Sequence, residues 1–300
     1  MKRLTIILLI LISLVKANAQ QDPLYTQFMF NPFVINPAIT GSHTYYQIWL
    51  NSRLQWMGLP DAPVTNTLSI YGPFEKLDMG VGGYVYSDVT GPTSRLGFKG
   101  AYAYNFAIND EYRLSFGLFA GMLQYKIDNS EIKFGDYEPE SINKEVYYLP
   151  DAAIGAYFYS SNLHAGISAD QLLNNKIPAF EEDSLLTKDA FGRLKSHFYI
   201  TGGYRYFINR DLALEPTLIL RVVKPATPQL DFNVRVIFQN MAWGGISFRS
   251  QDALAFVGGY TYQNKIFIGL SYDIGVTKLA KYNYGSFEAV IGYKFDSIKD

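Results

Sequence analysis

Residues 95–106, with the sequence RLGFKGAYAYNF, decide the fold class of this chain. Large apolar or aromatic side chains alternate with the other residues, and both cations, Arg95 and Lys99, lie on the second face. Successive side chains of a β-strand point to opposite sides. The stretch therefore predicts a strand with one apolar and one polar surface.

The same alternation recurs along the chain from about Tyr46. Residues 196–208 and 229–238 repeat it, with Phe, Val, Ile and Tyr on one face and charged or polar residues on the other. We count about fourteen such segments of roughly ten residues, a pattern typical of an antiparallel transmembrane β-barrel. Their expected first residues are Tyr46, Val64, Met79, Arg95, Tyr112, Asp151, Leu163, Ser196, Leu212, Gln229, Met241, Leu254, Lys265 and Ser286.

The polar faces carry more charge than a dry protein core tolerates. Burying ions without partners is costly, so we expect these charges to line a wet barrel lumen, where opposite charges can pair. The alternative is a soluble β-sandwich, in which the apolar rows would face inward. Tyr and Phe gather at segment ends, as interfacial aromatic girdles do, and this favours the barrel. The candidate lumen charges are Arg95, Lys99, Arg205, Glu215, Arg221, Asp231, Arg235 and Arg249.

Connection lengths support the same architecture. Periplasmic turns of outer-membrane barrels are short and external loops are longer, so we expect an even strand count with both termini in the periplasm. The tight connections span residues 107–111, 160–162, 209–211, 239–240 and 263–264. The longer connections span residues 126–149, 171–195 and 223–228 and fall in the other set.

The start of the chain reads as a secretory signal. Lys2 and Arg3 precede an apolar run at residues 4–15, and Ala17-Asn18-Ala19 supplies a cleavage site. An uncleaved anchor is the alternative, although the apolar run is short for a membrane span. We therefore expect a signal peptide at residues 1–19, a periplasmic or plug segment at 20–45, a barrel at 46–296 and a tail at 297–300.

The segment before the barrel does not alternate. Residues 20–42 are interrupted by three prolines, and they are too apolar for a free periplasmic tail. We expect the segment either to form a small plug in the barrel or to dock a periplasmic partner. The candidate plug or docking residues are Tyr25, Phe28, Phe30, Asn31, Pro32, Asn36 and Pro37.

This segment also carries a family resemblance. Gln21-Asp22-Pro23, QFMFNP at 27–32, Asn36-Pro37-Ala38 and RLQW at 53–56 resemble the N-terminal signature of the PorP/SprF family, over roughly the first 75 residues. That family serves the type IX secretion and gliding machinery of the Bacteroidetes. The resemblance implies a barrel in the outer membrane, surrounded by its lipid. It also implies two kinds of partner, a large secreted adhesin and periplasmic machinery or peptidoglycan-binding proteins. It brings no catalytic residues.

The chemistry of the chain points away from catalysis and from nucleic acid. The net charge is -1 and there is no cysteine, so we find no basic patch, disulfide or thiolate metal site. His164 and Ser168 share a strand face but lie ~13 Å apart, too far for a catalytic pair. The acidic residues of the long loops match no calcium-loop spacing. We therefore expect a protein that is not an enzyme and has no cofactor. The alternative function is a channel or transporter for small solutes or apolar molecules.

Overall fold

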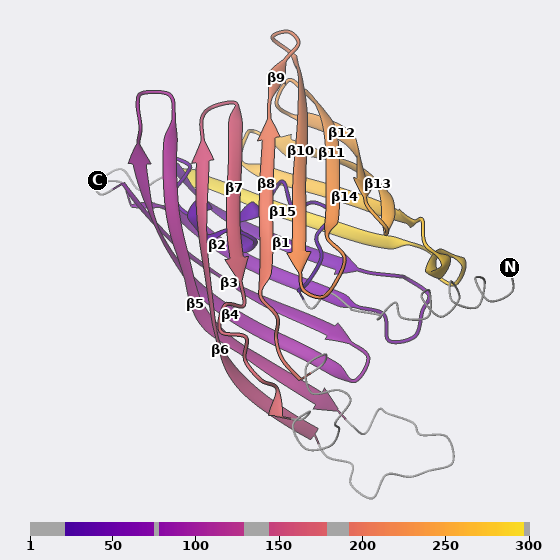
Figure 1. The fold of residues 1–300 in the computed structure, drawn as a ribbon. Coiled ribbons are helices and arrows are strands. Elements are labelled where there is room, and N and C mark those ends of the chain that lie inside the picture. The colour runs from indigo at the N-terminus through magenta and orange to yellow at the C-terminus, as the bar shows by residue number, and fades with distance from the viewer. Residues whose placement is uncertain (1–21, 75–77, 129–143, 179–191, 297–300) are drawn as a thin grey trace, which may run out of the picture.

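The computed structural model describes residues 22–74, 78–128, 144–178 and 192–296 (Figure 1). Within these residues the chain forms one antiparallel sheet in which strands pair with their neighbours in sequence, except that β8 and β9 both pair with β10 and not with each other. The strands are β1 (Tyr45–Leu54), β2 (Val64–Phe74), β3 (Met79–Thr90), β4 (Thr93–Ala107), β5 (Arg113–Asp128), β6 (Lys144–Tyr159), β7 (Leu163–Asp170), β8 (His197–Tyr204), β9 (Tyr206–Phe207), β10 (Leu212–Val223), β11 (Gln229–Phe238), β12 (Ala242–Arg249), β13 (Ala253–Tyr262), β14 (Ile266–Gly275) and β15 (Ser286–Asp296).

The sheet closes on itself. β1 pairs with β15 along its length, and β10 pairs with both β8 and β11, so the ladder returns to its start. β9 continues β8 along the same partner after a break at Arg205. The 15 labelled strands therefore make a closed barrel of 14, as the sequence predicted. Closure leaves no sheet edge with unpaired backbone groups in the bilayer.

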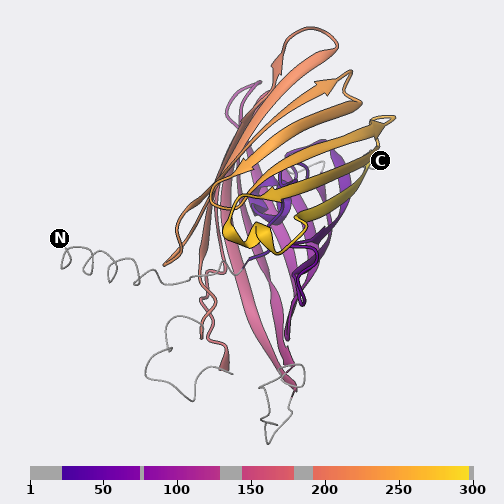
Figure 2. The same cartoon turned by 90° about the vertical axis from the view of Figure 1, so that its right-hand side faces the viewer.

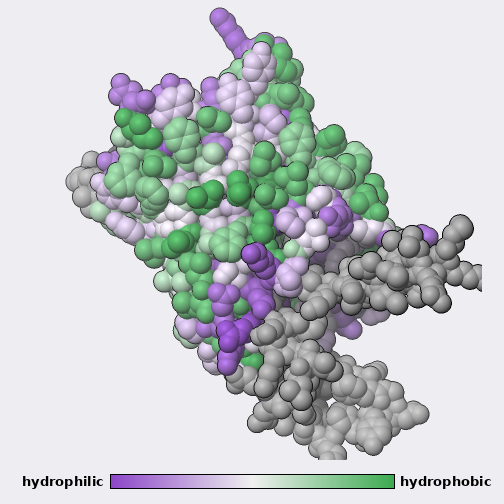
Figure 3. Space-filling model, in the orientation of Figure 1, coloured by the Kyte–Doolittle hydropathy of each residue, from purple (hydrophilic) through white to green (hydrophobic). Residues whose placement is uncertain are grey.

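The two faces of the wall differ as the alternation requires. On β4, Phe98 is 62% exposed on the outside, whereas Lys99 beside it is 3% exposed on the inside. Hydrophobic side chains spread over the outer wall, with hydrophilic ones gathered toward the two ends (Figure 3). Among the described residues, no helix has the length and hydrophobicity needed to cross a bilayer.

Strand starts agree with the predicted ones to within two residues, except for β6. This strand begins at Lys144 instead of Asp151, and β5 continues to Asp128, so the predicted long connection at 126–149 is wrong at both ends. The two strands pair over their whole length, including Gln124 with Tyr148. The adjacent aromatics Tyr147 and Tyr148 obscure the alternation there. Pairing with β5, and not a local pattern, defines this part of the strand.

The two ends of the barrel are distinct. Tyr45 pairs with Asp296, so the first strand begins and the last strand ends at the same end, which we call the short-turn end. Its turns include residues 108–112, 160–162 and 239–241. The opposite end, the long-connection end, carries residues 55–63, 171–196 and 276–285.

Candidate functional site: the barrel interior

Residues 22–42, which we call the lumen segment, lie inside the barrel (Figure 2). The segment contains two short 3-10 helices, η1 (Pro32–Val34) and η2 (Pro37–Ile39), each begun by a proline after an asparagine. Proline suits the first helical position because its missing N–H would have no partner there. Asn36 additionally accepts a hydrogen bond from the Ala38 N–H and caps η2.

The candidate residues of this segment contact the barrel interior. Pro32 is half-buried and the other six are buried: Tyr25, Phe28, Phe30, Asn31, Asn36 and Pro37. In this state they are packed within the protein and are not presented to solvent.

The lumen segment crosses the barrel from one end to the other. Asp22 lies at the long-connection end, where it accepts a hydrogen bond of 2.8 Å from the Tyr199 hydroxyl and lies 3.2 Å from Nδ1 of His197. Thr40 lies near the short-turn end, where its carbonyl accepts a hydrogen bond from Asn105. The chain then enters β1. The segment therefore starts at the end of the barrel opposite to the one where β1 begins. The first residues of the segment and the first residues of β1 thus lie at different ends, so they are not both on the periplasmic side.

Thr26 is held by four charged side chains, an arrangement we call the Thr26 clamp. Its hydroxyl lies 2.7 Å from a carboxylate oxygen of Asp273 and accepts hydrogen bonds of 2.8 Å from both Arg53 and Arg249. Its backbone N–H donates to Glu288. All five residues are buried. Hydrogen bonds to charged groups are strong, so the buried clamp holds the start of the segment in place.

Charge pairing extends from the clamp along the wall. Arg249 pairs with Asp231 at 3.1 Å, and Asp231 pairs with Arg221 at 2.7 Å. A buried ion without a partner would cost several kcal/mol. The pairs explain how these candidate lumen charges lie on the inner face while being almost fully shielded from solvent.

The other candidate lumen charges form separate clusters. Glu215 pairs with Arg205 and Arg235. Lys99 lies 2.8 Å from Asp151 and 2.5 Å from Asp170. Arg95 is half-buried and lies over the ring of Tyr125 at 5.5 Å. Six of the eight charges are buried: Lys99, Glu215, Arg221, Asp231, Arg235 and Arg249.

Aromatic stacking anchors the middle of the lumen segment. The Phe30 ring lies 4.4 Å from both Trp243 and Phe267, and the Arg235 guanidinium lies 4.3 Å from the Phe30 centroid. Phe33 stacks on Tyr71 at 4.3 Å. Burial of these rings supplies the apolar part of the attachment.

Glycines in the wall let η2 approach closely. A Cβ atom at Gly117 would lie 2.5 Å from the backbone nitrogen of Ala38, and one at Gly80 would lie 2.4 Å from the Thr40 carbonyl carbon. Any larger residue would force the segment away. The close fit therefore depends on glycine, which has no side chain, at these two positions of the wall.

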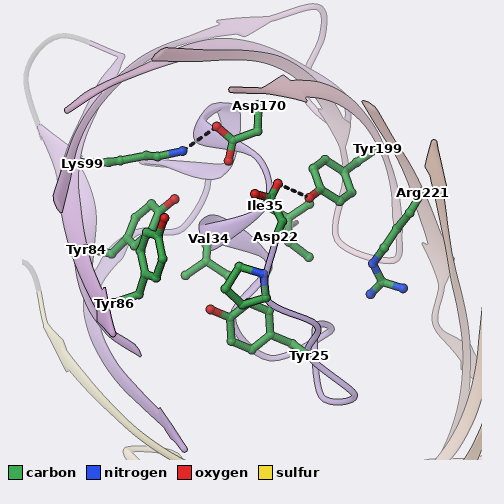
Figure 4. A pocket seen from close by; sticks show the side chains of 11 residues that line it. Asp22, Tyr25, Val34, Ile35, Tyr84, Tyr86, Lys99, Asp170, Tyr199 and Arg221 are labelled. Atoms are coloured by element: carbon green, nitrogen blue, oxygen red, sulfur yellow. Dashed lines mark hydrogen bonds and ion pairs between the residues drawn. The ribbon is translucent and has the colours of Figure 1, made fainter. Parts of the chain in front are cut away.

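A cavity of ≈ 30 Å³ remains between the lumen segment and the wall (Figure 4). Tyr84, Tyr86, Tyr199 and Arg221 reach it from the wall, and Tyr25 reaches it from the segment. The Tyr25 hydroxyl shares a 2.7 Å hydrogen bond with Thr67. The space suits about two water molecules.

Sequence reasoning missed Thr26 and three of the four charged residues of the clamp. The candidate lumen charges did not include Arg53, Asp273 and Glu288. Each of these residues nevertheless occupies a position of its strand whose side chain points into the barrel. Assigning alternate residues of every strand to the inner face would have identified them. Thr26 gave no signal, since a threonine in a non-alternating segment is unremarkable.

The residues considered for catalysis and metal binding take other roles or lie outside the described ranges. Ser168 donates to the Ile35 carbonyl. The residues described contain no cluster of three or more His, Asp or Glu suited to a metal ion. Glu145 accepts a hydrogen bond from Tyr147. Residues 1–21, with the expected signal peptide, the tail 297–300 and the remaining acidic loop residues lie outside the described ranges: Asp136, Glu138, Glu140, Glu181, Glu182 and Asp183.

Comparisons with solved structures agree on the fold. The chain is similar to the CymD monoaromatic hydrocarbon channel, with a TM-score of 0.51, 10% identity and coverage of 91% of this chain and 93% of that chain. It is also similar to the P. putida toluene transporter TodX, with a TM-score of 0.50, 7% identity and coverage of 88% and 93%. At such identities the likeness extends to the barrel alone.

No curated protein gives a sequence match. A family model described as type IX secretion system membrane protein PorP/SprF matches residues 17–293, which confirms the resemblance seen at the N-terminus. Together with the closed barrel, this match places the chain in the outer membrane. The chain belongs to the PorP/SprF family of type IX secretion system membrane proteins.

Proposed function

We propose that this barrel is a non-enzymatic component of the type IX secretion and gliding machinery. It supports the export or surface anchoring of a large adhesin-like protein by binding partners. These are the secreted protein itself and periplasmic type IX or peptidoglycan-binding proteins. Family membership supports the association with this machinery.

The filled interior is the observation that carries the proposal. The lumen segment occupies the barrel from Asp22 to Thr40, and the inner charges pair with one another. A barrel filled in this way is poorly suited to pass solutes and better suited to bind partner proteins on its surfaces. We propose that residues 22–42 act as a plug. Docking of a periplasmic partner on the same residues would require the segment to leave the barrel.

Surface labelling of intact cells tests the proposal. Cells lacking this chain should lose one or a few large surface proteins from the labelled fraction, and complementation with the full chain should restore them. Other outer-membrane barrels, measured in the same samples, control for general damage to the envelope. An unchanged set of surface proteins would refute the role in export or anchoring.

A channel for small solutes or apolar molecules is the second candidate. The titles of the two similar structures name a hydrocarbon channel and a toluene transporter. Their likeness supports only a shared barrel fold. Planar-bilayer recording of the purified chain separates the candidates, since a silent barrel favours partner binding and a steady, solute-selective current favours the channel.

A further inference from the structure

The outward row of β14 leads directly to an unusual group of exposed side chains. Leu270, Tyr272 and Ile274 face outward on the strand, and Val276 continues the row beyond it. The connection to β15 then forms η5 (Lys278–Lys281) at the long-connection end of the barrel (Figure 1). That end faces away from the cell in outer-membrane barrels, so η5 lies near the outer leaflet.

Two lysines and two tyrosines make up this group, which we call the rim cluster: Lys278, Lys281, Tyr282 and Tyr284. Tyr282 and Tyr284 are 72% and 77% exposed. Both lysines are exposed as well. Such exposure of aromatic rings is unfavourable in water and favourable at a membrane interface.

The rim cluster is fixed to the barrel wall at the level where the apolar row ends. The Tyr272 hydroxyl donates to the Tyr284 carbonyl. The Tyr284 N–H donates to the Met57 carbonyl at 2.7 Å, and the Met57 N–H donates to the Gly285 carbonyl at 2.8 Å. The Tyr284 ring lies against Gly58. The cluster is therefore an ordered rim above lipid-facing residues.

The local charge of this connection is positive. Residues 276–285, VTKLAKYNYG, contain no acidic residue. The nearby carboxylates Asp252 and Asp273 are engaged with Arg249 and Arg53. Across the described ranges, no ion pair joins Lys278 or Lys281 to a carboxylate.

The helix type brings the two charges together. Side chains three residues apart eclipse in a 3-10 helix, and Lys278 and Lys281 have this spacing in η5. Both ammonium groups can therefore reach one anion. Lysine stems lie along apolar surface while their charged ends reach toward lipid headgroups.

We propose that the rim cluster binds the phosphate group of an anionic lipid in the outer leaflet, with the two lysines on the phosphate and the two tyrosines at the headgroup level. The inference rests on the outer-membrane location and is independent of the proposed role in secretion. Each lysine near an anionic membrane surface contributes about 1 kcal/mol. Removing both should weaken lipid binding about 30-fold.

Native mass spectrometry of the full chain tests this proposal. The chain is released from nanodiscs of phosphatidylcholine containing a minor fraction of diphosphorylated lipid A, and retained lipid A is counted across a dilution series. Lys278→Gln/Lys281→Gln should lose retained lipid A. Arg210→Gln/Lys265→Gln removes two charges from the short-turn end and should retain it.

Two further arms identify the ligand. Tyr282→Ser/Tyr284→Ser, with both lysines kept, should weaken lipid binding, because a lipid is recognised at the headgroup level as well as by charge. Inorganic phosphate added without lipid A should not compete at equal concentration. Full competition by phosphate would overturn the lipid assignment, and equal retention by the lysine variant and its control would overturn the site.

Discussion

Thr26 shows how one residue links the lumen segment to four strands. Its hydroxyl is the shared partner of Arg53 and Arg249, and its N–H binds Glu288. The cations and carboxylates of this site come from β1, β12, β14 and β15. A small hydroxyl in this position satisfies buried N–H groups that no other residue of the segment reaches.

Removing that hydroxyl should loosen the segment. Thr26→Ala leaves guanidinium N–H groups of Arg53 and Arg249 without this acceptor, at a cost of about 1–3 kcal/mol. Thr26→Ser keeps the hydroxyl and should behave as the parent. Hydrogen exchange of residues 22–30, followed by mass spectrometry in detergent, measures the difference. Equal exchange in the Ala and Ser variants would show that the clamp does not hold the segment.

Buried Lys99 should be intolerant of neutral replacement. It lies between Asp151 and Asp170, so Lys99→Met leaves two carboxylates close together in a shielded site. Breaking a buried pair in this way costs about 3–5 kcal/mol. Heat-modified gel mobility, which reports barrel unfolding, should show a lower transition temperature for Lys99→Met than for Lys224→Met, an exposed control. Equal transition temperatures would contradict the structural role.

The lumen segment and the wall fit together as elements, through glycine as much as through charge. η2 packs against β4, β5 and β6. Gly117 of β5 contacts it so closely that no Cβ atom has room. Gly100 of β4 faces outward, and a Cβ atom there would lie 3.8 Å from the Ala120 carbonyl oxygen, an ordinary contact distance. The same residue type therefore has different roles on the two faces of the wall.

A paired alanine substitution tests this difference. Gly117→Ala should displace η2, since forcing extra atoms into a packed site costs about 1–3 kcal/mol. Gly100→Ala should have little effect on the segment. Hydrogen exchange of residues 36–41 is the measurement, and faster exchange is expected only in the first variant. A matching increase in both would point to general weakening of the sheet.

At the scale of the whole molecule, two features combine: a closed wall and a chain that passes through it. Fourteen strands enclose more space than wall side chains alone fill. The lumen segment supplies the missing atoms, and its rings and hydrogen bonds reach strands on opposite sides. The segment is thus part of the folded interior as well as the lead into β1.

Deleting residues 22–42 should open the barrel. We expect the deletion variant to conduct steadily in planar bilayers where the parent is silent, because neither wall charges nor rings can span the vacated space.

A disulfide between the segment and the wall provides a matched control. The Asn31 and Asn51 side chains touch at 2.9 Å, and the chain has no cysteine. An Asn31→Cys/Asn51→Cys pair, once oxidised, should keep the barrel silent. A silent deletion variant would contradict the plug.

The sequence by itself determined the strands, their faces and the closed membrane barrel. A period of two follows from local backbone geometry, so each strand reveals its lipid-facing and inward residues without knowledge of its neighbours. Family membership was likewise visible in a few short motifs. The exception was the connection between β5 and β6, where adjacent tyrosines hide the alternation and pairing between the two strands decides their bounds.

Only the tertiary structure decided how the interior is filled. Thr26 and Asp273 are 247 positions apart, and Lys99 and Asp170 are 71 apart. Such contacts form only because the wall closes and the lumen segment passes through it from the long-connection end. The position of a residue in the alternation predicts that its side chain points into the barrel. Which partner it meets there depends on the three-dimensional path of the whole chain.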